Sequence, residues 1–175
     1  FKTKTPGLTR KFKLEDPKER SAYFKAKAGK EIGKIKKFLK NKTFMGIFLG
    51  KKNSGKGTYI KLFMEAVGPE KIAHISVGDI VRDVHKELKN PSKRKALIKF
   101  LESRYRGFIG IEKALDIMEG RDTKTLQPTE IILALVERAI DRVGHKAVFV
   151  DGFPRSHDQV SYSLFLTSIK QPQVL

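Results

Sequence analysis

Apolar residues follow two patterns along this chain, short runs and helical spacing. The run at 43–49 has no polar face, which is typical of a strand covered on both sides in a parallel sheet. Two further short segments, 71–76 and 146–150, are also predicted strands. Longer segments between these runs carry apolar residues at helical spacing. Strands that alternate with helices of this length predict an α/β fold with a parallel sheet.

The predicted helices are marked by their apolar spacing and by their ends. Asp16 followed by Pro17 is an acidic N-cap with proline at the first helical position. This start predicts a helix that runs to about Lys40 and buries an apolar stripe of Phe24, Ala28, Ile32, Ile35 and Leu39. The other segments with helical spacing are 56–67, which ends at Gly68-Pro69, 78–89, the region around 97–105, 110–119 and 128–143.

Charge divides the chain into two parts. The net charge is +18, and residues 1–42 hold 15 Lys/Arg against 4 Asp/Glu. We therefore expect a basic N-terminal extension over 1–42, extended or disordered up to residue 15, and a core over 43–175. A second basic block lies at 86–106. Either block could be a solvated lysine-rich face or a contact for nucleic acid, and both interpretations stay open.

Composition also excludes some classes of site. The chain has no cysteine, so it has neither disulfides nor thiolate metal sites, which suits a cytoplasmic protein. No apolar run approaches the ~18 residues of a membrane-spanning helix. The four histidines, His74, His85, His145 and His157, lack the spacing of metal ligands and are expected to be structural or exposed.

A glycine-rich loop connects the first predicted strand to its helix. In the segment 50–58, Gly50, Gly55 and Gly57 allow the backbone to curl around phosphate oxygens at a helix N-terminus. Lys56 can reach the terminal phosphates, and Thr58 can offer a hydroxyl near a bound Mg²⁺. The predicted ATP-binding residues are Asn53, Ser54, Gly55, Lys56, Gly57 and Thr58.

The order Gly-Lys-Gly-Thr at 55–58 resembles the phosphate loop of adenylate kinases and related nucleoside monophosphate kinases. Those loops usually have Pro and Gly where this chain has Lys52 and Asn53. Asparagine tolerates a left-handed backbone better than most residues, so the loop can keep its shape.

The segment 75–82 is similar to the family's Thr-Gly-Asp segment. Its arginine, Arg82, is implied to grip the phosphate of the monophosphate substrate with a bidentate fork. Val77 stands where a base-contacting Thr is common, and Gly78 follows it. The loss of that hydroxyl leaves open a kinase for another monophosphate, such as UMP.

The segment 148–155 resembles the family's Asp-Gly-Phe-Pro-Arg box. The resemblance implies that Asp151 holds Mg²⁺ through water and that Gly152 and Phe153 approach the base. It also implies that Arg155 neutralises charge between the two phosphates and that Gln159 hydrogen-bonds the adenine edge. Upstream, the segment 124–127 resembles the part that closes over the base, which adds Leu126 and Gln127 to the AMP-binding set.

The resemblance implies a P-loop NTPase-type sheet that transfers the terminal phosphoryl group of ATP to AMP with Mg²⁺, and Lys56, Arg82 and Arg155 as its catalytic residues. An alternative is a non-catalytic kinase-like protein that binds nucleic acid or a ribonucleoprotein. The likeness covers about residues 43–166. In the family, the following sequence supplies more strands, a lid and further arginines, and three strands alone would leave the phosphate-loop strand open on one side. We expect the polypeptide to continue past Leu175. The alternatives are a partner chain that completes the sheet, or the basic N-terminal helix covering the gap. The chain alone should transfer phosphate slowly.

Overall fold

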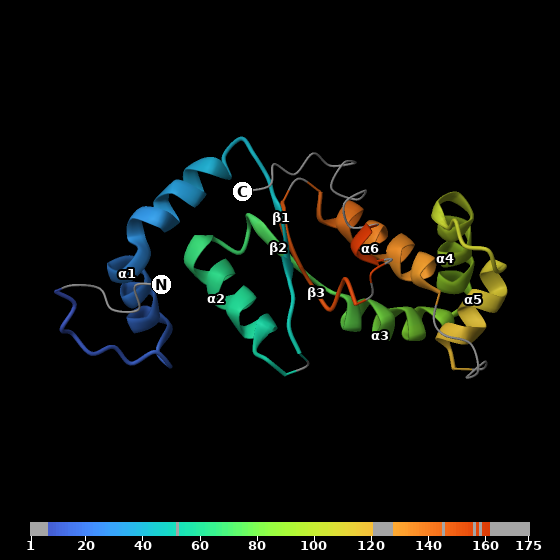
Figure 1. Ribbon diagram of the computed structural model, residues 1–175, viewed down its shortest axis with the longest axis horizontal. Coiled ribbons are helices and arrows are strands. Elements are labelled where there is room, and N and C mark those ends of the chain that lie inside the picture. The colour runs from blue at the N-terminus through green and yellow to red at the C-terminus, as the bar shows by residue number, and fades with distance from the viewer. Residues whose placement is uncertain are drawn as a thin grey trace.

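The computed structural model describes residues 7–51, 53–120, 128–144, 146–155, 157 and 159–161. In this part of the chain a three-stranded parallel sheet has the order β1-β3-β2. The strands are β1 (Met45–Phe48), β2 (Ile72–Ser76) and β3 (Ala147–Asp151). Figure 1 shows the sheet at the centre of an elongated molecule. The predicted α/β class with a parallel sheet is confirmed.

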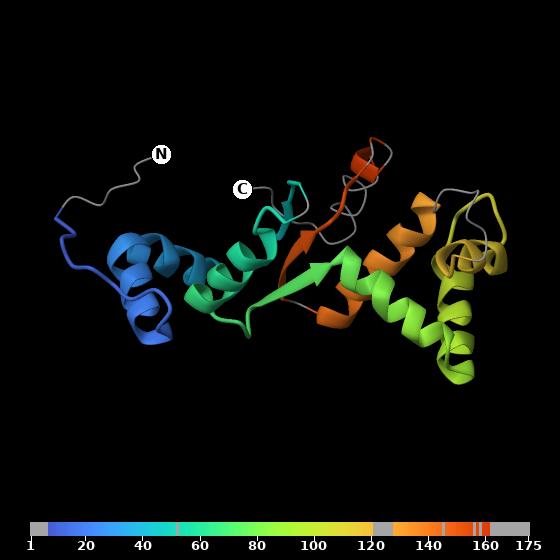
Figure 2. The same cartoon turned by 90° about the horizontal axis from the view of Figure 1, so that it is seen from below.

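Helices cover both faces of the sheet. One face is covered by α2 (Lys56–Val67), and α1 (Pro17–Phe38) packs against α2. The other face carries α3 (Val77–Leu88) and α6 (Thr129–Val143), and α4 (Pro91–Arg104) and α5 (Ile111–Met118) extend this layer outward. Figure 2 shows α1 and the α4–α5 pair at opposite ends of the molecule. Every predicted helix is present, with ends within about two residues of the prediction, except that α4 begins at Pro91, six residues before the predicted region around 97–105.

The central strand β3 shows why the strands lack a polar face. Val148 and Val150 contribute to a large core with α3, α4, α5 and α6, whereas Ala147 and Phe149 point into a smaller core with α2. Successive side chains of a strand alternate between faces, so a strand that is covered by helices on both sides is apolar at every position. This is the pattern that 147–150 displays.

Strand β1 differs from its prediction in burial. The apolar run at 43–49 predicts a strand covered on both sides, yet each of the four residues of β1 is only half-buried. The reason is its place at the edge of the sheet, because within the described ranges β1 pairs with β3 alone. The apolar run identifies the strand and not its position in the sheet.

Helix α1 begins as predicted and packs less deeply than predicted. The Asp16 side chain accepts a hydrogen bond from the Lys18 backbone N–H at 2.8 Å, and Pro17 is the first helical residue. The backbone leaves helical geometry at Ala28 (φ −140°, ψ 26°), so the apolar stripe is split into two short faces. No residue of α1 is fully buried, which corrects the expected burial of the stripe.

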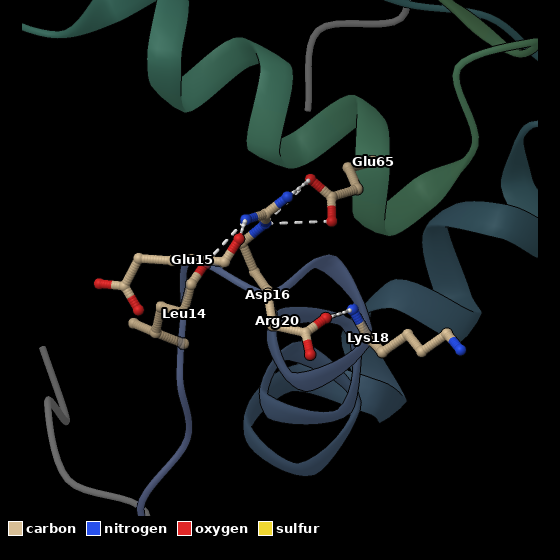
Figure 3. A network of polar contacts seen from close by, with 6 residues as sticks. All are labelled: Leu14, Glu15, Asp16, Lys18, Arg20 and Glu65. Atoms are coloured by element: carbon tan, nitrogen blue, oxygen red, sulfur yellow. Dashed lines mark hydrogen bonds and ion pairs between the residues drawn. The ribbon is translucent and has the colours of Figure 1, made fainter.

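A single arginine connects α1 to α2. Arg20 Nε donates to both carboxylate oxygens of Glu65 at 3.1 Å, and its Nη1 donates to the carbonyls of Leu14 and Glu15 at 2.7 and 3.3 Å. Figure 3 shows the guanidinium between the segment before α1 and the Glu65 side chain on α2. Arg20 thus ties α1 and the preceding loop to the core at once.

None of the helices in the described part of the chain has the length and apolar character needed to cross a membrane.

Candidate active site

The carboxyl ends of the three parallel strands meet at one edge of the sheet, where ligands bind in open α/β folds. A cleft of about 1110 Å³ lies there. Its lining includes every predicted site residue that the structure describes: Asn53, Ser54, Gly55, Lys56, Gly57, Thr58, Val77, Gly78, Arg82, Asp151, Gly152, Phe153, Arg155 and Gln159. Three motifs that lie far apart in the sequence therefore share one cleft. Leu126 and Gln127, as well as Lys52 of the loop, lie outside the described residues.

The phosphate loop leads from β1 into the first turn of α2. Gly55 is the N-cap, with a left-handed φ of 82°, and no side chain caps the helix. The N–H groups of the first turn lack partners within the helix, and the helix dipole makes this end electropositive. The loop therefore offers backbone donors to an anion in the cleft.

Two residues of this loop hold its shape. Asn53 has a positive φ of 62°, which is the left-handed backbone that the sequence predicts at this position. The Lys56 ammonium donates to the carbonyls of Gly50 and Lys51 at 3.0 and 2.8 Å. A phosphate entering the loop can take over these donors, because a charged oxygen is a stronger acceptor than a carbonyl.

The second motif forms the start of α3. Arg82 forms an ion pair with Asp79, and the hydrogen bond from Arg82, its charge, and a hydrogen bond from Ser76 hold the pKa of Asp79 below its ordinary value. Both side chains are mostly exposed, at 65% and 63%. The guanidinium thus lies at the cleft wall and has donors left for a second anion.

The third motif turns directly out of β3. The backbone N–H of Arg155 donates to Gln159 Oε1 at 2.7 Å, and Arg155 Nε donates to the Gly152 carbonyl at 2.7 Å. Gly152 has a φ of 76°, and a Cβ there would lie 3.1 Å from Arg155 Nη2. The turn thus orients the arginine through its Nε and leaves the Nη groups toward the cleft.

The sequence did not predict one polar pair in the cleft. His74 Nε2 lies 2.6 Å from Asp151 Oδ2, with the two side chains 19% and 15% exposed. His74 is on β2 and Asp151 ends β3, and adjacent parallel strands bring them together. Histidine spacing could not reveal the contact, because the partners are far apart in the chain. Lys61, Ser76 and Asp79 also line the cleft without having been predicted there.

The oxygen donors of the cleft are too few to hold a cation such as Mg²⁺ alone, and they suit it only when a bound phosphate adds its own oxygens. Across the described ranges no group of three or more His, Cys, Asp or Glu side chains could hold a metal ion. The Asp151 carboxylate and the Thr58 hydroxyl both line the cleft. One carboxylate, one hydroxyl and phosphate oxygens are the donor set that Mg²⁺ takes when it keeps several waters.

The comparisons with known proteins point to one family. An adenylate kinase from Thermotoga neapolitana is 33% identical over 128 residues, which are 73% of this chain and 46% of the relative. UMP-CMP kinase 3 from Arabidopsis thaliana is 28% identical over 127 residues, 73% of this chain and 50% of the relative. An adenylate kinase from Prochlorococcus marinus is 29% identical over 127 residues, 72% of this chain and 55% of the relative.

The chain spans about half the length of the curated relatives that it matches. No protein-family model matches it, and no solved structure matches it.

Proposed function

Because this chain belongs to the nucleoside monophosphate kinase family, we propose that the whole protein transfers the terminal phosphoryl group of ATP to AMP. The observation that supports the proposal is the shared cleft, in which the phosphate loop, Arg82 and Arg155 face one space. Phosphoryl transfer needs positioned cations and backbone donors more than a covalent participant. Relatives named adenylate kinase favour AMP as the acceptor.

In the proposed reaction, an oxygen of the AMP phosphate forms a bond to the γ-phosphorus of ATP. The bond from that phosphorus to the β–γ bridging oxygen breaks, and two ADP molecules result. The N–H groups at the start of α2 and the Lys56 ammonium bind the β- and γ-phosphate oxygens. Lys56 exchanges the carbonyls of Gly50 and Lys51 for these oxygens.

The two arginines have different parts in this proposal. Arg82 binds the acceptor phosphate from α3, where Asp79 holds its guanidinium at the cleft wall. Arg155 lies between donor and acceptor phosphates, oriented by the Gly152 carbonyl and by the turn to Gln159. Positive charge fixed in advance at the transferring group lowers the barrier, because the cations need not reorganise during the reaction.

We propose that Mg²⁺ accompanies ATP, held by Thr58 and, through water, by Asp151. When bound, it neutralises charge on the phosphate oxygens and orients them. The His74 contact fixes one carboxylate oxygen of Asp151, which leaves the other oxygen for the water shell of the ion.

Equilibrium binding tests the proposed donor site on the 175-residue chain. Lys56→Ala should weaken ATP binding by about tenfold to a hundredfold, because it removes charged hydrogen bonds of about 1.5–3 kcal/mol. Lys113→Ala is the matched control, because Lys113 is exposed on α5, away from the cleft. Equal ATP affinity in both variants would contradict the proposed loop function. A coupled assay of ADP formation on the whole protein, with Arg155→Ala as the inactive variant, tests transfer itself.

Acceptor preference is the second point to test. Val77 is buried and lines the cleft, and it offers no hydroxyl to a base. A relative is named UMP-CMP kinase, so UMP and CMP are competing acceptors. We expect AMP to bind more tightly than UMP or CMP in titration calorimetry. Tighter binding of UMP or CMP would mean that the acceptor substrate is a pyrimidine monophosphate and not AMP.

The non-catalytic alternative is favoured by the net charge of +18. It predicts nucleic-acid binding that survives Lys56→Ala and ADP formation that is absent from the whole protein. The kinase proposal predicts ADP formation that Lys56→Ala abolishes.

A further inference from the structure

Helix α1 has a charged side that faces away from the rest of the molecule. Lys30, Lys34 and Lys37 follow one another at helical spacings of four and three residues, and all three are exposed. At 1.5 Å per residue they span about 10 Å along the helix. Ile35 and Leu39 lie on the opposite side and pack against the smaller core. We call Lys30, Lys34 and Lys37 the lysine face of α1.

The charge of this region is not neutralised within the described residues. Residues 7–42 contain 13 Lys/Arg and 4 Asp/Glu. Ion pairs in the described part of this region join Arg10 to Glu19 and Arg20 to Glu65, and neither involves the lysine face. Three ammonium groups on one helical side thus form a fixed positive strip that faces solvent.

The second basic block uses its charge differently. On α4, Arg94 pairs with Glu112 and with Glu119, and Arg104 lies 3.7 Å from Glu137. These arginines hold α4 against α5 and α6. The sequence left open whether the block at 86–106 is a solvated face or a nucleic-acid contact, and two of its arginines are engaged within the fold. Lys93, Lys95 and Lys99 are also exposed on α4, but their spacings of two and four residues spread them over more than one side of the helix. The lysine face of α1 instead gathers three ammonium groups on one side.

The lysine face is held in place by packing and lies away from the cleft. It follows the break in α1 at Ala28, and Ile35 and Leu39 pack this half of the helix into the smaller core. Arg20 holds α1 against α2 through Glu65 and holds the preceding segment through two carbonyls (Figure 3). Glu65 is in the last turn of α2, whereas the phosphate loop precedes the first turn. The half of α1 that carries the lysine face leads into the start of β1, whereas the phosphate loop follows the other end of that strand. A ligand on the lysine face therefore lies away from the cleft, and Figure 2 shows α1 at one end of the molecule.

We propose that the lysine face of α1 binds the phosphate backbone of nucleic acid without sequence preference. A strip of spaced ammonium groups fits a chain of phosphates, and its binding energy comes from the release of counterions. An anionic membrane fits less well, because a membrane-bound helix inserts a large apolar face beside its lysines. In α1 the large apolar residues, such as Ile32 and Phe38, are half-buried, and none is fully exposed.

The experiment measures the binding of the 175-residue chain to a labelled single-stranded RNA of mixed sequence, about 20 nucleotides long, over a series of salt concentrations. Lys30→Gln, Lys34→Gln and Lys37→Gln are combined in one variant. Each phosphate contact contributes about 0.7 to the slope of log affinity against log salt on a single strand, so this slope should fall by about 2. The affinity should fall by about tenfold or more at low salt.

The matched control removes the same charge elsewhere. Lys93, Lys95 and Lys99 are exposed on α4. A variant that combines Lys93→Gln, Lys95→Gln and Lys99→Gln should change the affinity for RNA by less than about threefold. A variant that combines Lys30→Arg, Lys34→Arg and Lys37→Arg should retain binding, and thermal melts should show that each variant is folded.

Three results would overturn the proposal. The first is equal loss in the two Gln variants, which indicates general charge attraction. The second is stronger binding to vesicles of equal parts phosphatidylcholine and phosphatidylserine than to RNA. The third is no RNA binding at low salt. Kinase activity is not needed for any of these readouts, so this proposal is tested independently of the proposed reaction.

Discussion

Gly46 lies where a single methyl group would disturb the strand that carries the phosphate loop. Gly46 is paired with Phe149 across the sheet, and a Cβ on Gly46 would come within 2.6 and 2.7 Å of two ring carbons of Phe149. The ring cannot move freely, because Phe44, Phe48 and Phe63 surround it with centroid distances of 5.3, 5.1 and 5.1 Å. Gly46→Ala should therefore strain either β1 or the aromatic cluster.

The magnitude follows from two opposing effects. Overpacking a filled core costs about 1–3 kcal/mol, and alanine in a strand recovers about 0.5–1 kcal/mol of the entropy that glycine loses. We expect Gly46→Ala to lower the free energy of unfolding by about 1.5 kcal/mol. Phe149→Leu should lower it by about 2–3 kcal/mol, because it removes three ring contacts of about 0.5–1.5 kcal/mol each and retains part of the apolar volume.

Urea unfolding followed by circular dichroism measures these values in a double-mutant cycle. In the double variant the added methyl meets no ring, so the two losses should fail to add by about 1–2 kcal/mol. Gly33→Ala is the control, because Gly33 is an exposed helical glycine and a Cβ added to it would meet nothing within 4 Å. This variant should stabilise the chain by about 0.5–1 kcal/mol. Strictly additive losses, or a Gly46→Ala chain as stable as the parent, would refute the packing argument.

Three further predictions concern single residues. Arg82→Ala should raise the pKa of Asp79 toward its ordinary value, because Arg82 is the main cause of its lowering, and an NMR titration of the carboxyl measures it. Burial raises the pKa of Glu137 above its ordinary value of 4.5, so the folded chain loses stability as the pH rises from that value through the raised pKa; Glu137→Gln should remove this loss in urea unfolding measured over a pH series. Gly152→Ala should weaken AMP binding in calorimetry, because the added Cβ would lie beside Arg155 and displace its side chain. The left-handed backbone at this position also costs an alanine about 1–2 kcal/mol of conformational energy.

Local signals in the sequence predicted most of the fold. The cap at Asp16-Pro17 gave the start of α1, and Gly68 gave the end of α2. The apolar runs identified all three strands, and the left-handed backbone at Asn53 followed from its residue type. These features depend on residues within a few positions of each other, so a linear pattern contains them.

The features that the sequence did not predict depend on residues far apart in the chain. The contact between His74 and Asp151 is set by the neighbouring strands β2 and β3. The ion pair between Arg94 and Glu119 likewise joins two helices. Charge and apolar periodicity could not show which of these residues meet.

The pairing of β1 with β3 also determines when the molecule can become ordered during synthesis. Met45 pairs with Val148, roughly a hundred residues later, and closing a loop of that length costs entropy before any contact repays it. Helices α2 to α6 can form from local contacts, but the strand before the phosphate loop has no partner in the described sheet until β3 has emerged from the ribosome. We therefore expect the amides of β1 to gain protection last in pulse-labelled hydrogen exchange, together with those of β3.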